Sequence, residues 1–390
     1  MAWTGFSIEM KLLAVDIGTG TQDIVLFDTQ LDIENSFKLI LPSPTMRIFR
    51  KIKQATHDRV DILLSGYLMG GGPSTWAVKD HIRAGLKVYA TLSAGCTFDD
   101  DPEMVRGMGV IVISEDELTS LPAQVRRIHM CDFDYEEISR VFVDFGADLN
   151  DLAAIAVGVF DHGNAPAGVS DRKFRFDYLD MRIRAENRLS AFAYPANQIP
   201  AIMTRLQAVA ASARNIPAPL VVMDTAAAAI LGATYDAKVQ MLTHKIVVNI
   251  GNLHTLAFRL DETRITGMFE HHTGMLSQEQ LERLLIKLAE GTLTNAEIFE
   301  QHGHGALVYA SDSANLESDN LNLVVTGPRR NKLASSRLNP YLAVPFGDMM
   351  ITGCIGLLAA TADKIPHLSS PIHAGLNNGS ETKLAPWEVN

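Results

Sequence analysis

The chain has 390 residues, of which 47% are hydrophobic, so it can form roughly two to three ordinary domains with packed cores. Its 34 basic and 45 acidic residues give a formal net charge of −11, which argues against nucleic acid as a partner. The three cysteines, Cys96, Cys131 and Cys354, are too far apart in the sequence for a disulfide framework or a local metal motif.

The stretch MAWTGFSIEMK shows no basic region followed by an apolar one, and no apolar run approaches the roughly 18 residues of a membrane helix. These features predict a protein of the reducing cytoplasm that does not bind a membrane.

Strands and helices alternate in the first half of the chain, which favours a mainly parallel sheet covered by helices. A helix is predicted over residues 74–85, because Ser74 can cap its start and Gly85 can end it. The polar residues 161–179 are predicted to form a loop. Strands are predicted at residues 12–15, 24–27, 59–68, 86–94, 109–114 and 152–160, and further helices at 134–146 and 199–216.

The second half contains an echo of the opening: residues 245–260 again place a Gly-containing polar turn between two apolar runs. Ser277 and Gln280 have capping-box spacing, and Gly291 can end the amphipathic helix that follows them. Residues after Pro366 are predicted to be irregular. The remaining predictions are a strand at 219–224, a strand that runs into a Gly/Pro turn at 321–330, and helices rich in small residues at 225–233 and 347–361.

The stretch DIGTGTQD, residues 16–23, is the first with recognisable chemistry. A tight Gly-x-Gly turn leaves backbone N–H groups free to hold a phosphate, and threonine hydroxyls add donors. Asp16, just before the turn, can hold a hydrated Mg²⁺ that neutralises phosphate charge during transfer. The alternative is an ordinary Gly-rich hairpin with a solvated Asp.

Several segments resemble, in their order, the motifs of the superfamily of actin, sugar kinases and seventy-kilodalton heat-shock chaperones, called ASKHA. Residues 16–23 resemble its first phosphate loop and residues 249–258 its second. Residues 224–233 and 347–361 resemble its two connecting helices, and residues 324–330 resemble its adenosine loop. The resemblance implies the α/β, two-lobed actin-like ATPase fold, built from ribonuclease H-like lobes, with ATP and Mg²⁺ between them.

The resemblance also implies a domain organisation. It places an N-terminal lobe at residues 1–222, with an inserted α/β subdomain at about 45–120, and a C-terminal lobe at 223–365. Residues 366–390 remain as an irregular tail. Small residues suit helices that cross closely at a hinge, and we expect Ala226 to Ala229 to face Gly353, Gly356 and Ala360; an ordinary buried pair of helices is the alternative.

The site residues that the resemblance implies fall into the three loops. Asp16 is the metal ligand and a catalytic residue. The nucleotide-binding residues are Gly18, Thr19, Gly20 and Thr21 in the first turn, Asn249, Gly251, Asn252 and Thr255 in the second, and Gly327 and Arg329 in the adenosine loop.

Two of these positions depart from the family pattern. Asn249 stands where the second phosphate loop normally has Asp, and an amide cannot act as a general base at neutral pH. Nucleotide hydrolysis is therefore a weaker expectation than nucleotide binding. Arg329 replaces a small residue of the adenosine loop, where it could stack on a base, pair with phosphate or be a solvated charge.

Phosphoryl transfer also needs a carboxylate opposite the phosphate loops. We expect Asp161, at the end of an apolar strand, to be that catalytic residue, with His162 next to it in contact with substrate. The alternative is an Asp that caps a turn at the end of a strand.

Two further groups of residues are candidates for binding. Glycines at 70–72, in front of a predicted helix, could let an acidic substrate approach free N–H groups, although an empty tight turn is equally compatible. Histidines gather at residues 269–274 and 300–305, and we expect His271 or His272 to contact substrate. A zinc or iron site is the less favoured alternative, because adjacent histidines point in different directions and no H-x-x-x-H pair is present.

The sequence as a whole also resembles a prokaryotic family sometimes labelled pyruvate formate-lyase-activating protein. A radical-SAM activator needs a C-x-x-x-C-x-x-C motif, which the spacing of the cysteines does not provide. Three functions remain open: an ATP-dependent kinase of a small molecule, an ATPase that activates a partner enzyme, and a nucleotide- or ligand-binding module without turnover. The oligomeric state stays open too, with a homodimer among the alternatives.

Overall fold

The computed structural model describes residues 10–166, 168–309, 316, 321–377 and 383–388. The strands of these residues form two six-stranded sheets and one four-stranded sheet. The ends of the chain at residues 1–9 and 389–390, and residues 378–382 of the predicted tail, lie outside the described part. Among the helices of the described residues, none has the length and apolar character needed to cross a membrane.

The first sheet has the strand order β3-β2-β1-β8-β10-β9. Its first three strands form an antiparallel meander, whereas β8 and β10 run parallel to β1. Alternate residues of β1 enter different cores, with Leu12 and Ala14 on one face and Leu13 and Val15 on the other. The strands are β1 (Lys11–Ile17), β2 (Thr21–Asp28), β3 (Phe37–Pro42), β8 (Leu152–Val159), β9 (Ala193–Pro195) and β10 (Leu220–Asp224).

The second sheet has the order β14-β13-β12-β11-β15-β16 and repeats this plan. Strands β11, β12 and β13 form an antiparallel meander, and β15 and β16 continue in parallel from β11. The strands are β11 (His244–Ile250), β12 (His254–Asp261), β13 (Arg264–His272), β14 (Gly305–Val308), β15 (Asn322–Thr326) and β16 (Tyr341–Leu342). In each large sheet the antiparallel meander is followed by two further parallel strands, in the order β3-β2-β1-β8-β10 in one sheet and β13-β12-β11-β15-β16 in the other. This is the strand order of a ribonuclease H-like lobe, which confirms the predicted fold class.

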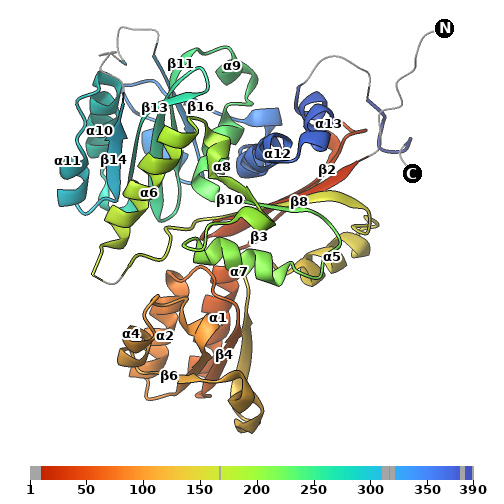
Figure 1. Cartoon of the computed structure of the whole chain (residues 1–390), viewed down its shortest axis with the longest axis vertical. Coiled ribbons are helices and arrows are strands. Elements are labelled where there is room, and N and C mark those ends of the chain that lie inside the picture. Colours follow the sequence, from red (N-terminus) through yellow and green to blue (C-terminus); the bar gives the residue numbers. More distant parts are fainter. Residues whose placement is uncertain (1–9, 167, 310–315, 317–320, 378–382, 389–390) are drawn as a thin grey trace.

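The third sheet is entirely parallel, in the order β6-β5-β4-β7, and forms a separate unit at the bottom of Figure 1. The insertion was predicted at about 45–120, but β7 lies beyond residue 120 and pairs with the central strand β4. Its strands are β4 (Ile62–Gly66), β5 (Val88–Thr91), β6 (Val110–Ile113) and β7 (Arg126–Met130), with helices α1 (Pro44–His57), α2 (Pro73–Arg83), α3 (Leu92–Gly95) and α4 (Pro102–Gly107).

The remaining helices cover the two large sheets and lie between them (Figure 1). The capping box of Ser277 and Gln280 is present at the start of α10, and Gly291 ends that helix in the left-handed conformation, both as predicted. The helices are α5 (Tyr135–Asp144), α6 (Asp171–Ala185), α7 (Thr204–Ser212), α8 (Thr225–Ala233), α9 (Ala237–Gln240), α10 (Gln278–Glu290), α11 (Asn295–Glu300), α12 (Thr352–Lys364) and α13 (Pro366–Leu376).

Several sequence-based predictions of secondary structure are wrong. The N-cap of α2 is Gly72 rather than Ser74, and the strand predicted at 86–94 ends at Thr91, where α3 begins. Helix α6 begins inside the predicted loop 161–179; its buried face includes the charged Arg175, which hid the apolar pattern. Helix α13 occupies the start of the predicted irregular tail, with Leu368, Ile372 and Leu376 buried at helical spacing. The small-residue helix predicted at 347–361 begins only at Thr352, after short 3-10 turns.

Helices α8 and α12 cross with their backbones in contact. A Cβ on Gly232 would lie 1.7 Å from the carbonyl oxygen of Thr352, and one on Gly356 would lie 1.9 Å from that of Ala228. The expected contact of the alanine run with Gly356 is therefore present. Gly353 faces the carboxylate of Asp16 instead, and only glycine fits there, because a Cβ would lie 1.9 Å from Oδ2.

Candidate nucleotide-binding cleft

A cavity of about 330 Å³ lies where the two large sheets and the inserted unit meet. Its wall includes both Gly-containing hairpin turns, the starts of α8 and α12, and the glycine run before α2. The predicted site residues that line it are Asp16, Gly18, Thr19, Gly20, Thr21, His162, Asn249, Gly251, Asn252 and Gly327.

Hydrogen bonds hold the first hairpin turn beside this cavity. The amide of Gly18 donates to the carbonyl of Thr21 at 2.9 Å, which closes the turn between β1 and β2. Ser43, the N-cap of α1, donates from its backbone to Gly20 at 3.1 Å and from its hydroxyl to Thr19 at 2.5 Å. The turn is therefore fixed by the first residues of the inserted unit.

The second hairpin turn approaches the first across the cavity. The amide of Gly251 donates to the carbonyl of His254 at 2.9 Å, in the same pattern as the first turn. A Cβ on Gly20 would lie 2.6 Å from Nδ2 of Asn252, so the two turns are nearly in contact. Thr255 is placed differently from the prediction: its side chain is buried and shares a 2.9 Å hydrogen bond with Thr273.

Two carboxylates face each other beneath the first turn. Asp16 on β1 pairs in register with Asp23 on β2, and both side chains are buried. Thr225, at the start of α8, donates to Oδ1 of Asp16 at 2.5 Å. Within the part of the chain that the structure describes, Oδ1 of Asp23 is buried and finds no hydrogen-bond partner.

Burial changes the protonation of both acids. It raises the pKa of Asp16 to about 7. Burial, followed by the neighbouring carboxylate of Asp16, raises the pKa of Asp23 to about 8. An ionised pair at this position needs a cation, and hard oxygen ligands of this kind suit Mg²⁺.

The adenosine-loop residues divide between the cavity and the surface. Gly327 has a φ of +97°, and a Cβ there would lie 2.4 Å from Oδ1 of Asn249, so glycine is required at this contact. Arg329 donates its backbone N–H to Ile250 at 3.0 Å, but its side chain is exposed and lies outside the cavity wall.

Asp161 is buried behind the cavity. Its two carboxylate oxygens accept backbone N–H bonds from Gly163 at 2.8 Å and from Leu206 at 2.9 Å. Burial raises the pKa of Asp161. Its carboxylate thus holds the turn that follows β8, as in the alternative of an Asp capping a turn, while the neighbouring His162 is exposed and lines the cavity.

The inserted unit supplies one end of the cavity. Gly70, Gly71, Gly72 and Pro73 line it together with Thr45 and Arg205. A Cβ on Gly70 would lie 2.6 Å from Nη2 of Arg205 and 2.7 Å from Oγ1 of Thr45. Arg205 is held by Asp132 at 2.7 Å and donates to the carbonyl of Phe160 at 2.8 Å. A guanidinium and a helix start beside bare backbone make this end suited to an anionic group.

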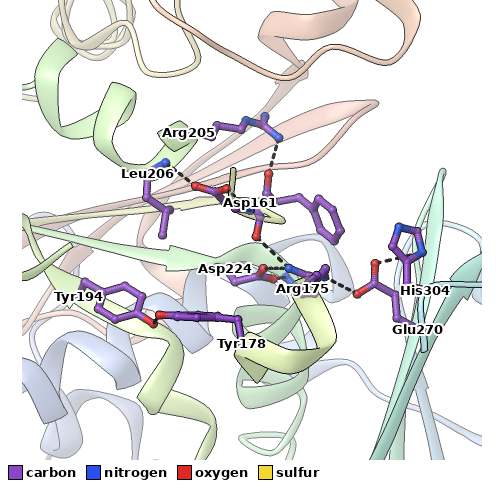
Figure 2. A network of polar contacts seen from close by, with 12 residues as sticks. Asp161, Arg175, Tyr178, Tyr194, Arg205, Leu206, Asp224, Glu270 and His304 are labelled. Atoms are coloured by element: carbon purple, nitrogen blue, oxygen red, sulfur yellow. Dashed lines mark hydrogen bonds and ion pairs between the residues drawn. The ribbon is translucent and has the colours of Figure 1, made fainter. Parts of the chain in front are cut away.

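Behind the cavity, Arg175 of α6 joins residues of both lobes (Figure 2). It donates to Glu270 of β13 at 2.7 Å, to Asp224 of β10 at 2.9 Å and to the carbonyl of Asp161 at 2.8 Å. Burial alone would raise the pKa of Glu270, but the Arg175 guanidinium lowers it to about 2. This ionised network ties the first sheet and α6 to the second sheet.

The two adjacent histidines of β13 point to opposite faces of the sheet, as strand geometry requires. His271 is buried, with Nδ1 3.3 Å from the carbonyl of His272, and is outside the cavity wall. His272 packs against His254 and His304, and of these three only His254 lines the cavity. Burial lowers the pKa of His254 to about 4 and that of His304 to about 3.

The site also contains Asp23, Arg205, Thr225 and His254, which are not among the site residues predicted from the sequence. Asp23 could have been found, because closing the hairpin around Gly18–Gly20 places it opposite Asp16. Arg205 reaches the cavity only through tertiary packing. Thr225 lies in the predicted helix 225–233, but its contact with Asp16 depends on how that helix packs against the first hairpin.

The strand order and the cleft define the class of this protein: a two-lobed actin-like ATPase fold of the ASKHA superfamily. The chain belongs to the family described as "Putative pyruvate format-lyase activating enzyme (DUF1786)", whose model matches residues 69–332. No curated protein matches the sequence.

Solved structures similar to this chain include two bacterial proteins. The ethanolamine utilization protein EutJ from Carboxydothermus hydrogenoformans is 11% identical with a TM-score of 0.31, over 90% of this chain and 88% of that one. The activator of the 2-hydroxyisocaproyl-CoA dehydratase from Clostridium difficile, solved with bound ADPNP, is 11% identical with a TM-score of 0.34, over 95% of this chain and 100% of that one. The strand order of the two large sheets shows the fold.

Proposed function

We propose that this chain binds Mg²⁺-ATP in the cleft between its two lobes and transfers the terminal phosphoryl group to a small molecule. One observation carries the proposal: two glycine turns from equivalent hairpins converge on one cavity beside a pair of buried carboxylates. Backbone N–H groups at such turns hold phosphate oxygens, and the acids supply the ligands for a cation.

The residues beneath the first turn fit Mg²⁺. Asp16 and Asp23 would hold the ion, which supplies charge neutralisation of the phosphates when it is bound. The unpartnered Oδ1 of Asp23, counted over the described residues, and the raised pKa values of both acids fit a cation held between them. Thr225 orients the carboxylate of Asp16 through its hydroxyl.

The end of the cavity formed by the inserted unit is the proposed acceptor site. Arg205 and the glycines at 70–72 suit an acceptor that carries a negative charge. His162, which lines the cavity, is the proposed base for the acceptor hydroxyl, because a neutral imidazole carries one nitrogen that can accept a proton. Asp161 would position His162 by holding the turn that carries it.

Asn249 favours a second candidate, a nucleotide- or ligand-binding module without turnover. It lines the cavity where the superfamily pattern has an acid, and an amide cannot activate water. The placement of the cysteines gives no support to the activating-enzyme description of the family. Cys96 follows α3, Cys131 follows β7, and Cys354 is buried in α12 with its thiol donating to the carbonyl of Asp23.

Calorimetric titration of the full chain with Mg²⁺-ATP tests the nucleotide site. We expect binding to the wild type and a loss of at least about tenfold in affinity for Asp16→Ala, because a charged ligand of the cation is removed. Asp261→Ala is the matched control: it changes an acid at the far end of the second hairpin, which lies outside the cavity wall. No binding of Mg²⁺-ATP to the wild type would overturn the proposal.

A second measurement separates the proposed functions. ADP release that appears only with an added anionic metabolite supports the kinase. The Arg205→Met variant should then release no ADP when the same metabolite is added. ADP release stimulated by a partner enzyme would identify an ATPase activator instead. Binding of ATP without ADP release under any of these conditions would support the second candidate, a nucleotide-binding module without turnover.

A further inference from the structure

Three histidines meet at the edge of the second sheet, on the side that faces the cleft. His254 at the start of β12 lies directly opposite His272 at the end of β13, so their side chains share one face of the sheet. His304 immediately precedes β14, and its backbone N–H donates to the carbonyl of Glu270 at 2.9 Å. Sequence positions 254, 272 and 304 are thus brought together by three neighbouring strands.

The imidazole rings converge on one point. The ring centroids are 5.2 Å apart for His254 and His272, 4.8 Å for His254 and His304, and 4.6 Å for His272 and His304. One nitrogen from each ring can be chosen so that all three lie within 4.8 Å of one another. Three Zn–N bonds of about 2.0–2.1 Å in tetrahedral geometry require nitrogens about 3.4 Å apart, which small side-chain rotations would achieve.

A buried carboxylate stands behind this cluster. Oε1 of Glu270 lies 3.6 Å from Nδ1 of His304, and among the described residues neither atom has a hydrogen-bond partner. Figure 2 shows Glu270 between His304 and Arg175. A carboxylate that accepts from one ring nitrogen fixes the tautomer of a histidine and leaves the other nitrogen free for a metal.

One histidine of the cluster, His254, reaches the cleft. His254 lines the cavity and stacks on Phe160, with ring centroids 4.5 Å apart and planes inclined by 25°. The guanidinium of Arg175 lies over the ring of Phe160, 4.3 Å from the ring centroid. The charge of Arg175 is balanced by Glu270 and Asp224. An ion here would be held by three protein ligands and would keep a coordination position toward the cavity.

We propose that His254, His272 and His304 form a binding site for a divalent transition-metal ion of the Zn²⁺ class, with Glu270 as the residue that orients His304. Imidazole ligands select such ions over Mg²⁺, which prefers oxygen, so this site is distinct from the acid pair Asp16 and Asp23. The open position would take water or an oxygen atom of a molecule in the cleft. This metal site does not depend on the proposed nucleotide binding.

Titration of the untagged, chelator-treated full chain with Co²⁺ alone, without nucleotide, tests this site. We expect visible d–d absorption that saturates at one ion per chain, is displaced by Zn²⁺ and resists a large excess of Mg²⁺. His272→Gln and His304→Gln should each weaken Co²⁺ binding by at least about tenfold. The matched control is His302→Asn, an exposed histidine of the same loop whose positive φ of 63° asparagine tolerates.

A second readout uses only the wild type, so the test does not depend on whether the variants fold. Paramagnetically shifted NMR signals of the Co²⁺-loaded chain should include ring protons of three coordinated imidazoles. Absence of saturable Co²⁺ binding to the wild type would overturn the proposal, as would an equal loss in His302→Asn. A count of fewer than three coordinated imidazoles would overturn the ligand assignment.

Discussion

The two large sheets share one strand order, yet their first hairpins present different chemistry to the cleft. In the first hairpin, Asp16 pairs in register with Asp23. In the second, the equivalent pair is Asn249 and Leu256. Both turns offer backbone N–H groups, but only the first offers carboxylates to a cation. The duplicated backbone therefore gives both lobes the same glycine turn, whereas only the first lobe has side chains suited to the proposed cation.

Buried carboxylates in the two lobes also differ in charge state. Glu270 on the second sheet has a guanidinium beside it, and its pKa falls to about 2. No basic side chain lowers the pKa of Asp16 or Asp23 on the first sheet, and burial raises these pKa values to about 7 and about 8. Similar burial thus gives opposite shifts, because only Glu270 has a fixed cation.

The largest expected effect breaks the ion-pair network around Arg175, to which the second lobe contributes Glu270. Glu270→Gln should lower the free energy of unfolding by about 3–5 kcal/mol, because Arg175 remains buried with one carboxylate fewer. Urea denaturation followed by circular dichroism measures this, with the exposed Glu279→Gln on α10 as the control. A loss below about 1 kcal/mol would show that Asp224 alone compensates the buried charge of Arg175.

Asp16→Asn should have the next largest effect, on ligand affinity. It keeps the size of the side chain and removes its charge, so we expect Mg²⁺-ATP affinity to fall by about 10- to 100-fold, or about 1.4–2.7 kcal/mol. Calorimetry at neutral pH measures it. If Asn249→Asp raised the affinity as much as Asp16→Asn lowers it, the two hairpins would be equivalent and the contrast between them would be lost.

Asp23→Asn should stabilise the metal-free protein while weakening Mg²⁺ binding. A carboxyl group whose pKa is higher in the folded than in the unfolded protein stabilises the folded state below its unfolded pKa, here 3.8. This stabilisation is lost as the pH rises through the folded pKa of about 8. Wild-type stability without Mg²⁺ should therefore fall between about pH 4 and pH 8. The variant should gain about 1 kcal/mol at pH 8 and show a flatter profile in thermal melts. An unchanged profile would contradict a buried, uncompensated pair.

Asn249→Ala should have the smallest effect. It removes one neutral hydrogen-bonding group from the cavity wall, which is worth about 0.5–1.5 kcal/mol, so Mg²⁺-ATP affinity should fall by less than about tenfold. Titration beside Asp16→Asn under the same conditions measures the ratio of the two losses. A loss at Asn249 that matches the one at Asp16 would mean that the second hairpin contributes as much as the first.

Much of the fold was predictable from local patterns. The capping box at Ser277 and Gln280 and the apolar runs on both sides of each glycine turn were legible in the sequence, because caps and strand hairpins depend on neighbouring residues. Helix α6 was missed because Arg175 occupies a buried position that only its ion partners on β10 and β13 make favourable. The role expected for Asp161 assumed a side chain facing the cleft, whereas backbone amides of the adjacent turn and of α7 hold it away.

By itself the sequence determined the two glycine hairpins, the acid before the first of them and the small-residue helices between the lobes, since each is a local pattern of residue types. Only the tertiary structure decided that both turns meet across one cavity, that the glycine run of the insertion closes its far end, and that His254, His272 and His304 converge. Those residues come from strands that are distant in the sequence, and strand pairing and lobe packing, rather than any local motif, determine which of them meet.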